Sequence, residues 1–391
     1  MSPQKPLAGI RVLELARILA GPWCGQALAD LGADVVKVER PGEGDDTRSW
    51  GPPFVETAGG ERGTAGYYLA TNRGKRSITV EMDKPEGQER IRCLASKADI
   101  LIENFKVGGL RKYGLDYGSL SKVNPRLIYC SVTGFGQDGP YASRGGYDFM
   151  IQGIGGIMSI TGEPEGEPMK TAVAYADVFT GLYSAVAILG ALEGRRNSGR
   201  GCHIDMALLD TQVSVLGNQG MIQLLTGSPP PRYGNAHSSI VPYQVFPASD
   251  GHIVIACGND GQFRRLCEVL GTFWADDERF ATNPARTAHR DTLVPMLAAE
   301  TRKRRKGDLL AAFEKAVVPA GPINTLPEVF EDPQVVHRRM AFDLPDPEAR
   351  GGTVPTLRGP IVIDGEPAVA RAPAPHLGQH NEEVAADPDW N

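Results

Sequence analysis

The sequence predicts an α/β fold built on a mostly parallel sheet, followed by a smaller unit. Strand and helix patterns alternate through the first third of the 391 residues, which is typical of βαβ units. The Pro-rich segment 226–232 (TGSPPPR) is typical of a linker between domains. The length corresponds to two or three domains of roughly 100–200 residues each.

The predicted elements follow from short apolar runs and from helix signals. Gly32 stands where a helix C-cap glycine belongs, and Pro85 lies in a first helical turn. The apolar helix 179–193 should be buried, and 203–225 should be helical. Further strands are expected over 10–15, 33–39, 77–80, 99–103, 126–132, 241–246 and 252–256, and helices over 20–31, 84–98, 261–270, 293–300 and 306–315. Residues 133–170, rich in Gly, Pro and acidic side chains, should form ligand-facing loops.

Composition narrows the class of protein. The net charge of −6 argues against a nucleic-acid partner, and the basic run 302–306 should be a solvated helix face. The six cysteines form no CxxC pair, which is typical of reduced thiols in the cytoplasm. No signal peptide is visible, and the apolar stretch 172–192 is too interrupted for a membrane span. The sequence predicts a soluble, cytoplasmic protein.

Two motifs that suggest cofactors are weak here. Gly134-x-Gly136-x-x-Gly139 follows a strand, but Pro140 comes next and no helix pattern opens, so binding of NAD is not favoured. His376 and His380 are spaced like ligands but lie in a Pro/Gly-rich tail, so no metal site is expected.

Asp177 is the carboxylate with the most chemical interest. It precedes the apolar helix, where an Asp commonly caps the helix by accepting backbone N–H bonds. The alternative is a nucleophile: a carboxylate kept ionised in a dry pocket attacks an activated acyl group. The loop Gly258–Gln262 likewise allows two interpretations, a tight turn or a mobile lid whose N–H groups contact an acyl group.

The sequence resembles the family III CoA-transferases over nearly its whole length. The resemblance rests on 7–45 (LAGIRVLELARILAGPWCGQALADLGADVVKVERPGEGD), 100–117, 124–141, 176–185 (ADVFTGLYSA) and 376–384 (HLGQHNEEV). Two further segments, 234–246 and 321–335, are most similar to succinyl-CoA-dependent dicarboxylate CoA-transferases.

The resemblance implies a fold and an assembly. The expected fold is a Rossmann-like large domain with a smaller α+β domain, and two such chains interlock as a homodimer. Residues 1–225 should form the CoA-binding large domain, 226–325 the linker and small domain, and 326–391 a segment that returns to the large domain.

The resemblance also implies roles for individual residues. Asp177 matches the nucleophile that forms an acyl-aspartyl anhydride and then an aspartyl-CoA thioester. The family's CoA-binding positions fall on Ile18, Leu19, Arg40, Val80, Met82, Asn104, Phe105 and Lys112. Leu19 replaces a Gln of formyl-CoA transferase, so acyl specificity should differ. The substrate and lid side is expected to comprise Tyr147, Asp148, His237 and the loop residues Gly258, Asn259, Asp260, Gly261 and Gln262.

The implied reaction uses a CoA thioester as substrate, with no permanently bound cofactor. Succinyl-CoA is the expected donor, and a small dicarboxylate is the expected acceptor. Arg73 or Arg144 is the suggested partner of the acceptor's second carboxylate. The alternative is a 2-methylacyl-CoA racemase on the same fold, which pairs the Asp with a His in a G-H-D motif. Here that motif is Gly146-Tyr147-Asp148. A phenol, with an ordinary pKa of about 10, is a poor second base, which favours the transferase.

Overall fold

The protein's computed structural model describes residues 5–391, which divide into two compact units. The first contains the described residues up to Ile157 together with Lys170–Thr226 and Pro333–Asn391. The second contains Met158–Met169 and Gly227–Asp332. The second unit therefore takes in a short segment that precedes α7 (Tyr175–Ser198) as well as the chain after the Pro-rich linker.

The first unit is built on a six-stranded sheet in the order β5-β2-β1-β6-β7-β8, and all neighbouring strands are parallel. This confirms the predicted α/β class with a parallel sheet. In this order β2 and β5 lie on one side of β1, whereas β6, β7 and β8 lie on the other side. The loops that follow β1 and β6 therefore run in opposite directions, and a crevice that can bind ligands opens between them at the carboxyl ends of the strands. The strands are β1 (Arg11–Glu14), β2 (Asp34–Glu39), β5 (Lys75–Thr79), β6 (Ile100–Glu103), β7 (Ile128–Thr133) and β8 (His203–Ala207).

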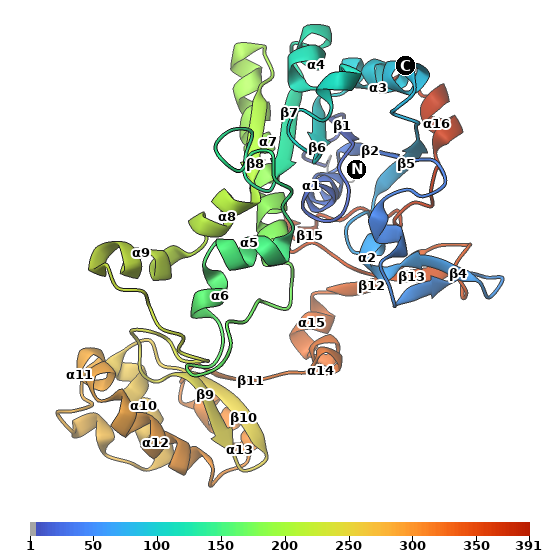
Figure 1. Ribbon diagram of the computed structural model, residues 1–391. Coiled ribbons are helices and arrows are strands. Elements are labelled where there is room, and N and C mark those ends of the chain that lie inside the picture. Colours follow the sequence, from blue (N-terminus) through green and yellow to red (C-terminus); the bar gives the residue numbers. More distant parts are fainter. Residues whose placement is uncertain (1–4) are drawn as a thin grey trace. The chain divides into compact units, whose positions relative to one another are not determined.

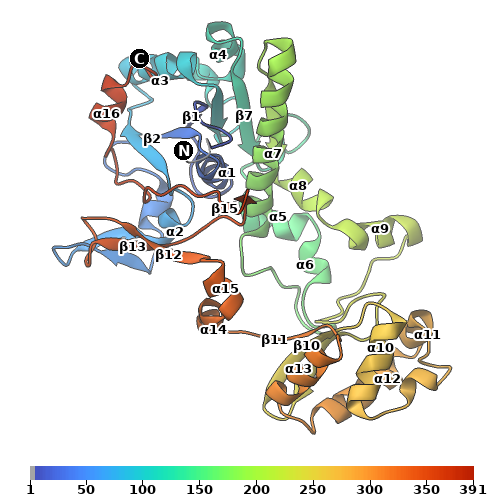
Figure 2. The same ribbon diagram turned by 180° about the vertical axis from the view of Figure 1, so that it is seen from behind.

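Helices cover both faces of this sheet, because its central strands are apolar on both sides. Val12 of β1 packs with α1 (Ala20–Asp30) and α7 in one core, whereas Leu13 packs with α3 (Pro85–Lys97) and α4 (Tyr117–Val123) in the other. Figures 1 and 2 show α1 and α3 separated by the strands. Pro85 is the first residue of α3, and Gly32 has a φ of 102°, as predicted from the helix signals.

Two expectations about helices were wrong. Residues 203–225 are not one helix, because His203–Ala207 forms β8 and bonds to β7 before α8 (Leu208–Ser214) and α9 (Gly217–Thr226) begin. The apolar helix α7 is not buried all round. In the part of the chain that the structure describes, α7 is the one helix long and apolar enough for a membrane span, yet only 33% of its most apolar window is buried.

The C-terminal segment packs on the sheet of the first unit. The N-terminal end of α16 (Asn381–Ala386) lies against β5, where the His380 N–H donates to the Ser77 carbonyl at 2.9 Å (Figures 1 and 2). The smaller elements of this unit are η1 (Asp46–Ser49), β3 (Phe54–Glu56), β4 (Arg62–Ala65), α2 (Gly66–Leu69), η2 (Arg111–Tyr113), α5 (Asp148–Ile154), α6 (Ile157–Ile160, partly in the second unit), α15 (Pro333–His337), β12 (Ala341–Pro345), β13 (Thr353–Leu357), β14 (Val362–Ile363) and β15 (Glu366–Pro367).

The second unit is a three-stranded antiparallel sheet, in the order β11-β10-β9, with helices. The basic run 302–306 is mostly the turn between two of its helices rather than a helix face, and Arg304 donates to the Val269 carbonyl at 2.9 Å. The elements are β9 (Tyr243–Ala248), β10 (Gly251–Ala256), α10 (Asp260–Leu270), η3 (Trp274–Asp276), α11 (Asn283–Ala288), α12 (Arg290–Thr301), α13 (Lys306–Lys315), β11 (Ala320–Pro322) and α14 (Leu326–Glu331).

Candidate active site

Two adjoining cavities open at the carboxyl edge of the parallel sheet. The smaller, of about 200 Å³, is lined by residues that follow β1, β6 and β7 and by Asp177 of α7. The larger, of about 820 Å³, is lined by residues that follow β2 and β5. Arg17 and Phe105 line both cavities. Arg17 follows β1 and Phe105 follows β6, and the strand order reverses between these two strands. The cavities therefore lie at the topological switch point, where an open α/β sheet binds ligands.

Asp177 is the third residue of α7 and lines the small cavity. It does not cap its own helix, because Asp148 does so from elsewhere in the chain. The Asp148 Oδ1 atom accepts from the backbone N–H groups of Ala176 and Asp177, at 2.8 and 3.3 Å. The capping role considered for Asp177 therefore belongs to Asp148, and the Asp177 carboxyl is left to face the cavity.

Burial controls the charge of Asp177. Burial of this carboxyl, and secondly the neighbouring Asp148 carboxylate, raise the pKa of Asp177 to about 7. The sequence interpretation, a carboxylate held ionised at the helix N-terminus in a dry pocket, underestimated how far burial raises the pKa. Both protonation states are populated near neutral pH, a property common among groups that do chemistry in clefts.

Close backbone packing places Asp148 at this helix end. A Cβ added to Gly134 would come within 2.7 Å of the Gly146 Cα, so the two loops approach as only glycines allow. Gly146 leads into Tyr147, which lines the small cavity, and into Asp148, which starts α5. The Gly134–Gly139 motif thus serves packing after β7, whereas a dinucleotide loop follows the first strand of its sheet.

Comparisons with known proteins agree with this arrangement. A family model described as CoA-transferase family III matches residues 7–381. The chain belongs to this family. It is 58% identical, over 98% of its own length and 95% of the relative's, to a succinate–glutarate CoA-transferase of Agrobacterium fabrum. It is 41% identical to the succinyl-CoA:glutarate CoA-transferase of Mus musculus, over 97% and 86% of the two chains.

Solved structures of similar proteins share the fold. A CAIB/BAIF family protein from Brucella suis matches with a TM-score of 0.87 and 54% identity, over 99% of this chain and all of the other. A hypothetical protein from Mycobacterium tuberculosis matches with a TM-score of 0.85 and 29% identity, over 98% and 99% of the chains. The protein is therefore a CoA-transferase enzyme, and CoA thioesters are its substrates.

Of the residues predicted to bind CoA, all but Lys112 line one of the two cavities. Ile18, Leu19, Asn104 and Phe105 line the small one. The large one is lined by Arg40, Val80, Met82 and Phe105. Lys112 lines neither cavity, but its Nζ lies 4.5 Å from the ring centroid of Tyr113, which lines the large one.

The remaining substrate and lid positions belong to the second unit. Asn259 caps α10, since its Oδ1 accepts from the Gln262 N–H at 2.9 Å, and Gln262 Oε1 accepts from the Gly258 N–H at 2.7 Å. Asp260 forms an ion pair with the buried Arg286 at 2.8 Å. The His237 Nδ1 accepts from the Ser239 N–H at 3.1 Å. Locally, the glycine loop is therefore a capped helix N-terminus, which agrees with a tight turn, and its role as a lid stays a prediction.

The two arginines suggested for a second carboxylate have different surroundings. Arg73 is buried in an ion pair with Asp30 at 2.6 Å and lines neither cavity, so it is a structural residue. Arg144 lines the small cavity, with its guanidinium carbon 4.4 Å from the Tyr141 ring centroid. The two tail histidines do not act together: His376 pairs with Asp346 at 3.0 Å, and the His380 Nδ1 accepts from the Ser77 N–H.

Sequence reasoning missed a buried charged cluster behind the small cavity. Its members are Glu14, Lys37, Asp45 and Lys75, and their side chains are inaccessible or nearly so. Lys37, which lies between Val36 and Val38, was the available signal, because a lysine inside a buried parallel strand needs a partner.

Proposed function

We propose that the protein transfers CoA from succinyl-CoA to a small dicarboxylic acid. The observation that carries this proposal is the Asp177 carboxyl in a small cavity that adjoins a larger one. The relatives support the substrate class, since their names pair succinate or succinyl-CoA with glutarate and, in Haloarcula hispanica, succinyl-CoA with mesaconate.

The proposed mechanism keeps the energy of the thioester. The nucleotide part of CoA occupies the large cavity, and the acyl thioester passes Arg17 and Phe105 to Asp177. The ionised carboxylate attacks the thioester carbonyl, the C–S bond breaks, and CoA thiolate leaves, which forms a mixed anhydride. The thiolate then attacks the Asp177 carbonyl of the anhydride and releases succinate, which leaves an aspartyl-CoA thioester.

The second half reverses these steps with the acceptor. Its carboxylate attacks the aspartyl-CoA carbonyl and expels the thiolate, and the thiolate attacks the acceptor's acyl carbon, so that Asp177 is freed as a carboxylate. Oxyanions form at each addition, and hydrogen bonds from backbone N–H groups would stabilise them. Arg144 is assigned to the distal carboxylate, because it is a cationic residue that lines the cavity of Asp177.

The homodimer and the cytoplasmic location belong to the same proposal. The exposed side of α7 carries an apolar stripe of Leu182, Tyr183, Val186 and Leu189. A stripe of this kind is costly to leave in water, so a second copy of the chain is the proposed cover. No membrane or nucleic-acid partner is invoked.

The test is a product analysis in deuterated buffer. The enzyme is incubated with succinyl-CoA and a pool of dicarboxylates, and CoA esters are measured by mass spectrometry. New esters without deuterium at the α-carbon are expected. Deuterium in a 2-methylacyl-CoA control, with no new ester, would instead establish the racemase.

Two variants assign the residues in this assay. Asp177→Ala should abolish transfer but retain CoA binding by calorimetry, since the large cavity is untouched. Full activity of this variant would refute Asp177 as nucleophile.

Arg144→Ala should raise the KM for dicarboxylates about tenfold, which corresponds to the loss of one charge-assisted contact, but leave the KM for monocarboxylate acceptors unaffected.

A further inference from the structure

The turn from β1 to α1 contains a strained residue. Ile18 has a φ of 75°, a region that a β-branched side chain enters only against steric resistance. Glycine would relieve the strain, yet the position holds an isoleucine that lines the small cavity together with Asp177. Strain of this kind persists only where surrounding contacts enforce it.

Hydrogen bonds hold three consecutive residues of this turn. The Lys37 ammonium donates to the Ala16 carbonyl at 2.8 Å. The Arg17 N–H donates to Asn104 Oδ1 at 2.9 Å, and Asn104 Nδ2 donates back to the Arg17 carbonyl at 2.7 Å. The Ile18 N–H lies 3.2 Å from both carboxylate oxygens of Asp45. The strained residue is therefore held by a carboxylate 27 positions away.

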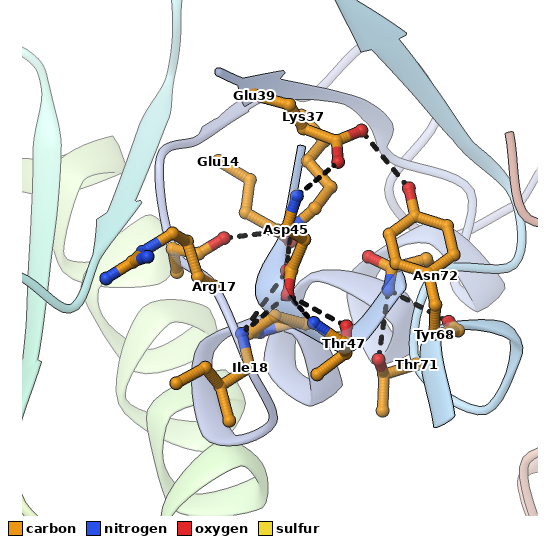
Figure 3. Close-up of polar contacts among 12 residues, drawn as sticks. Glu14, Arg17, Ile18, Lys37, Glu39, Asp45, Thr47, Tyr68, Thr71 and Asn72 are labelled. Atoms are coloured by element: carbon orange, nitrogen blue, oxygen red, sulfur yellow. Dashed lines mark hydrogen bonds and ion pairs between the residues drawn. The ribbon is translucent and has the colours of Figure 1, made fainter. Parts of the chain in front are cut away.

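Asp45 is itself fixed by donors on both oxygens. Its Oδ1 accepts from the Thr47 N–H at 3.0 Å and the Thr47 hydroxyl at 2.8 Å, and its Oδ2 pairs with Lys37 at 2.9 Å. Burial works against this charge, but Lys37 and Thr47 outweigh it and lower the pKa of Asp45 to about 2. Figure 3 shows the Ile18 nitrogen directed at Asp45, with the Ile18 side chain pointing away from the cluster.

Glu14 and Lys75 complete the cluster. Lys37 lies 3.0 Å from Glu14 Oε1, and Lys75 lies 2.8 Å from Glu14 Oε2. Lys75 also donates to the Pro22 carbonyl in the first turn of α1, at 2.9 Å. A cluster of buried charges is weak evidence for stability, because desolvation offsets much of the attraction. Its contacts instead converge on the backbone that borders the small cavity.

We propose that Asp45 is a positioning residue for CoA transfer, which holds the strained Ile18 backbone so that Ile18 and Leu19 form a fixed wall beside Asp177. This inference rests on the proposed function of the small cavity. A fixed wall keeps the thioester carbonyl within reach of the Asp177 carboxylate, and positioning of reacting atoms is a large part of catalysis. Loss of the hold lowers kcat more than it raises the KM for acyl-CoA.

The test is a double-mutant cycle between Asp45 and Ile18. Asp45→Asn keeps the shape of the side chain, but its NH₂ group faces another donor, either Lys37 or the N–H groups of Thr47 and Ile18. The hold on Ile18 is thereby lost, and kcat should fall roughly tenfold to hundredfold. Ile18→Gly removes the steric strain at φ 75°, although it also opens the wall. In the Ile18→Gly background, Asp45→Asn should cost less than about threefold, since glycine needs no hold.

A milder pair keeps the cycle informative if Asp45→Asn does not fold. Thr47→Val removes one hydroxyl donor, 2.8 Å from Asp45, and leaves the Thr47 N–H in place. It should lower kcat about threefold in the natural chain and have little effect beside Ile18→Gly. Equal losses in both backgrounds, for either substitution, would overturn the proposal.

Asp30→Asn is the matched control, because it also breaks a buried ion pair, with Arg73, away from both cavities. Asp30→Asn should lower the Tm without changing kcat and without coupling to Ile18→Gly. A loss of kcat equal to that of Asp45→Asn would mean that Asp45 acts through general stability.

The proposed nucleophile and the proposed positioning role can be refuted separately. Retained activity in Asp177→Ala refutes the proposed nucleophile, whereas an absent Asp45–Ile18 coupling with an inactive Asp177→Ala refutes only the positioning role.

Discussion

The carboxyl group of Asp177 must be ionised to attack a thioester, yet its surroundings favour the protonated form. Because its pKa is about 7, kcat/KM for acyl-CoA should rise as the pH is raised from 6 to 8. Asp148→Asn should shift this rise to lower pH, since it removes the repulsion between the carboxylates but keeps an amide oxygen for the helix N–H groups. The shift should be partial, because burial is the larger cause. An unmoved profile would show that another group controls the rate.

The same residue should weaken the fold. The pKa of Asp177 is raised from 3.8 to about 7, so between these values the folded protein binds more protons than the unfolded chain. The free energy of unfolding therefore falls as the pH rises through this window, and the cost is fully present above pH 7. Asp177→Asn removes the charge and should raise the Tm by about 2–4 °C at pH 8, but not at pH 4. Calorimetry at the two pH values checks this; equal gains would contradict a charge effect.

At the scale of elements, the placement of the α7 N-terminus depends on the contact between Gly134 and Gly146. Gly134→Ala puts a Cβ 2.7 Å from a backbone atom that cannot rotate away. The loop that carries Asp148 must shift, so we expect a stability loss of about 1–3 kcal/mol and a loss of transfer activity. Gly145→Ala is the control for stability, since a Cβ there meets nothing within 4 Å. Denaturant unfolding measures the free energy of unfolding of both variants. Equal losses of stability in Gly134→Ala and Gly145→Ala would show that the glycine contact is unimportant.

Local signals predicted elements well where the determinants of an element are local. Short apolar runs located most of the parallel strands, and helix signals located α3, including Pro85 at its start. The start of α7 was placed late, because its cap comes from Asp148, 28 positions before Ala176. Strand β8 was missed because its residues are half-exposed and merge with the helical pattern that follows. The partners of Lys37 could not be predicted from the sequence, because Glu14 and Asp45 contact Lys37 only in the folded chain.

At the scale of the whole molecule, the exposed stripe on α7 predicts self-association. Leu182, Val186 and Leu189 lie three to four residues apart and so share one helix face, and Val186 is 63% exposed. A helix of Ala, Leu and Val that is apolar nearly all round needs burial on both sides, and the chain's own core covers only one. The proposed homodimer would bury this face, which the single chain leaves exposed.

Val186→Glu should therefore give a monomer in place of the proposed dimer, because a carboxylate in an apolar interface loses hydration without a partner. Light scattering after size exclusion gives the mass directly, with 42.0 kDa expected for the variant and about twice that for the natural chain. Val123→Glu is the matched control, since Val123 is 47% exposed at the end of α4, outside the stripe, and it should remain dimeric. A natural chain that elutes as a monomer, or a Val186→Glu variant that stays dimeric, would show that the α7 stripe does not bind a second copy.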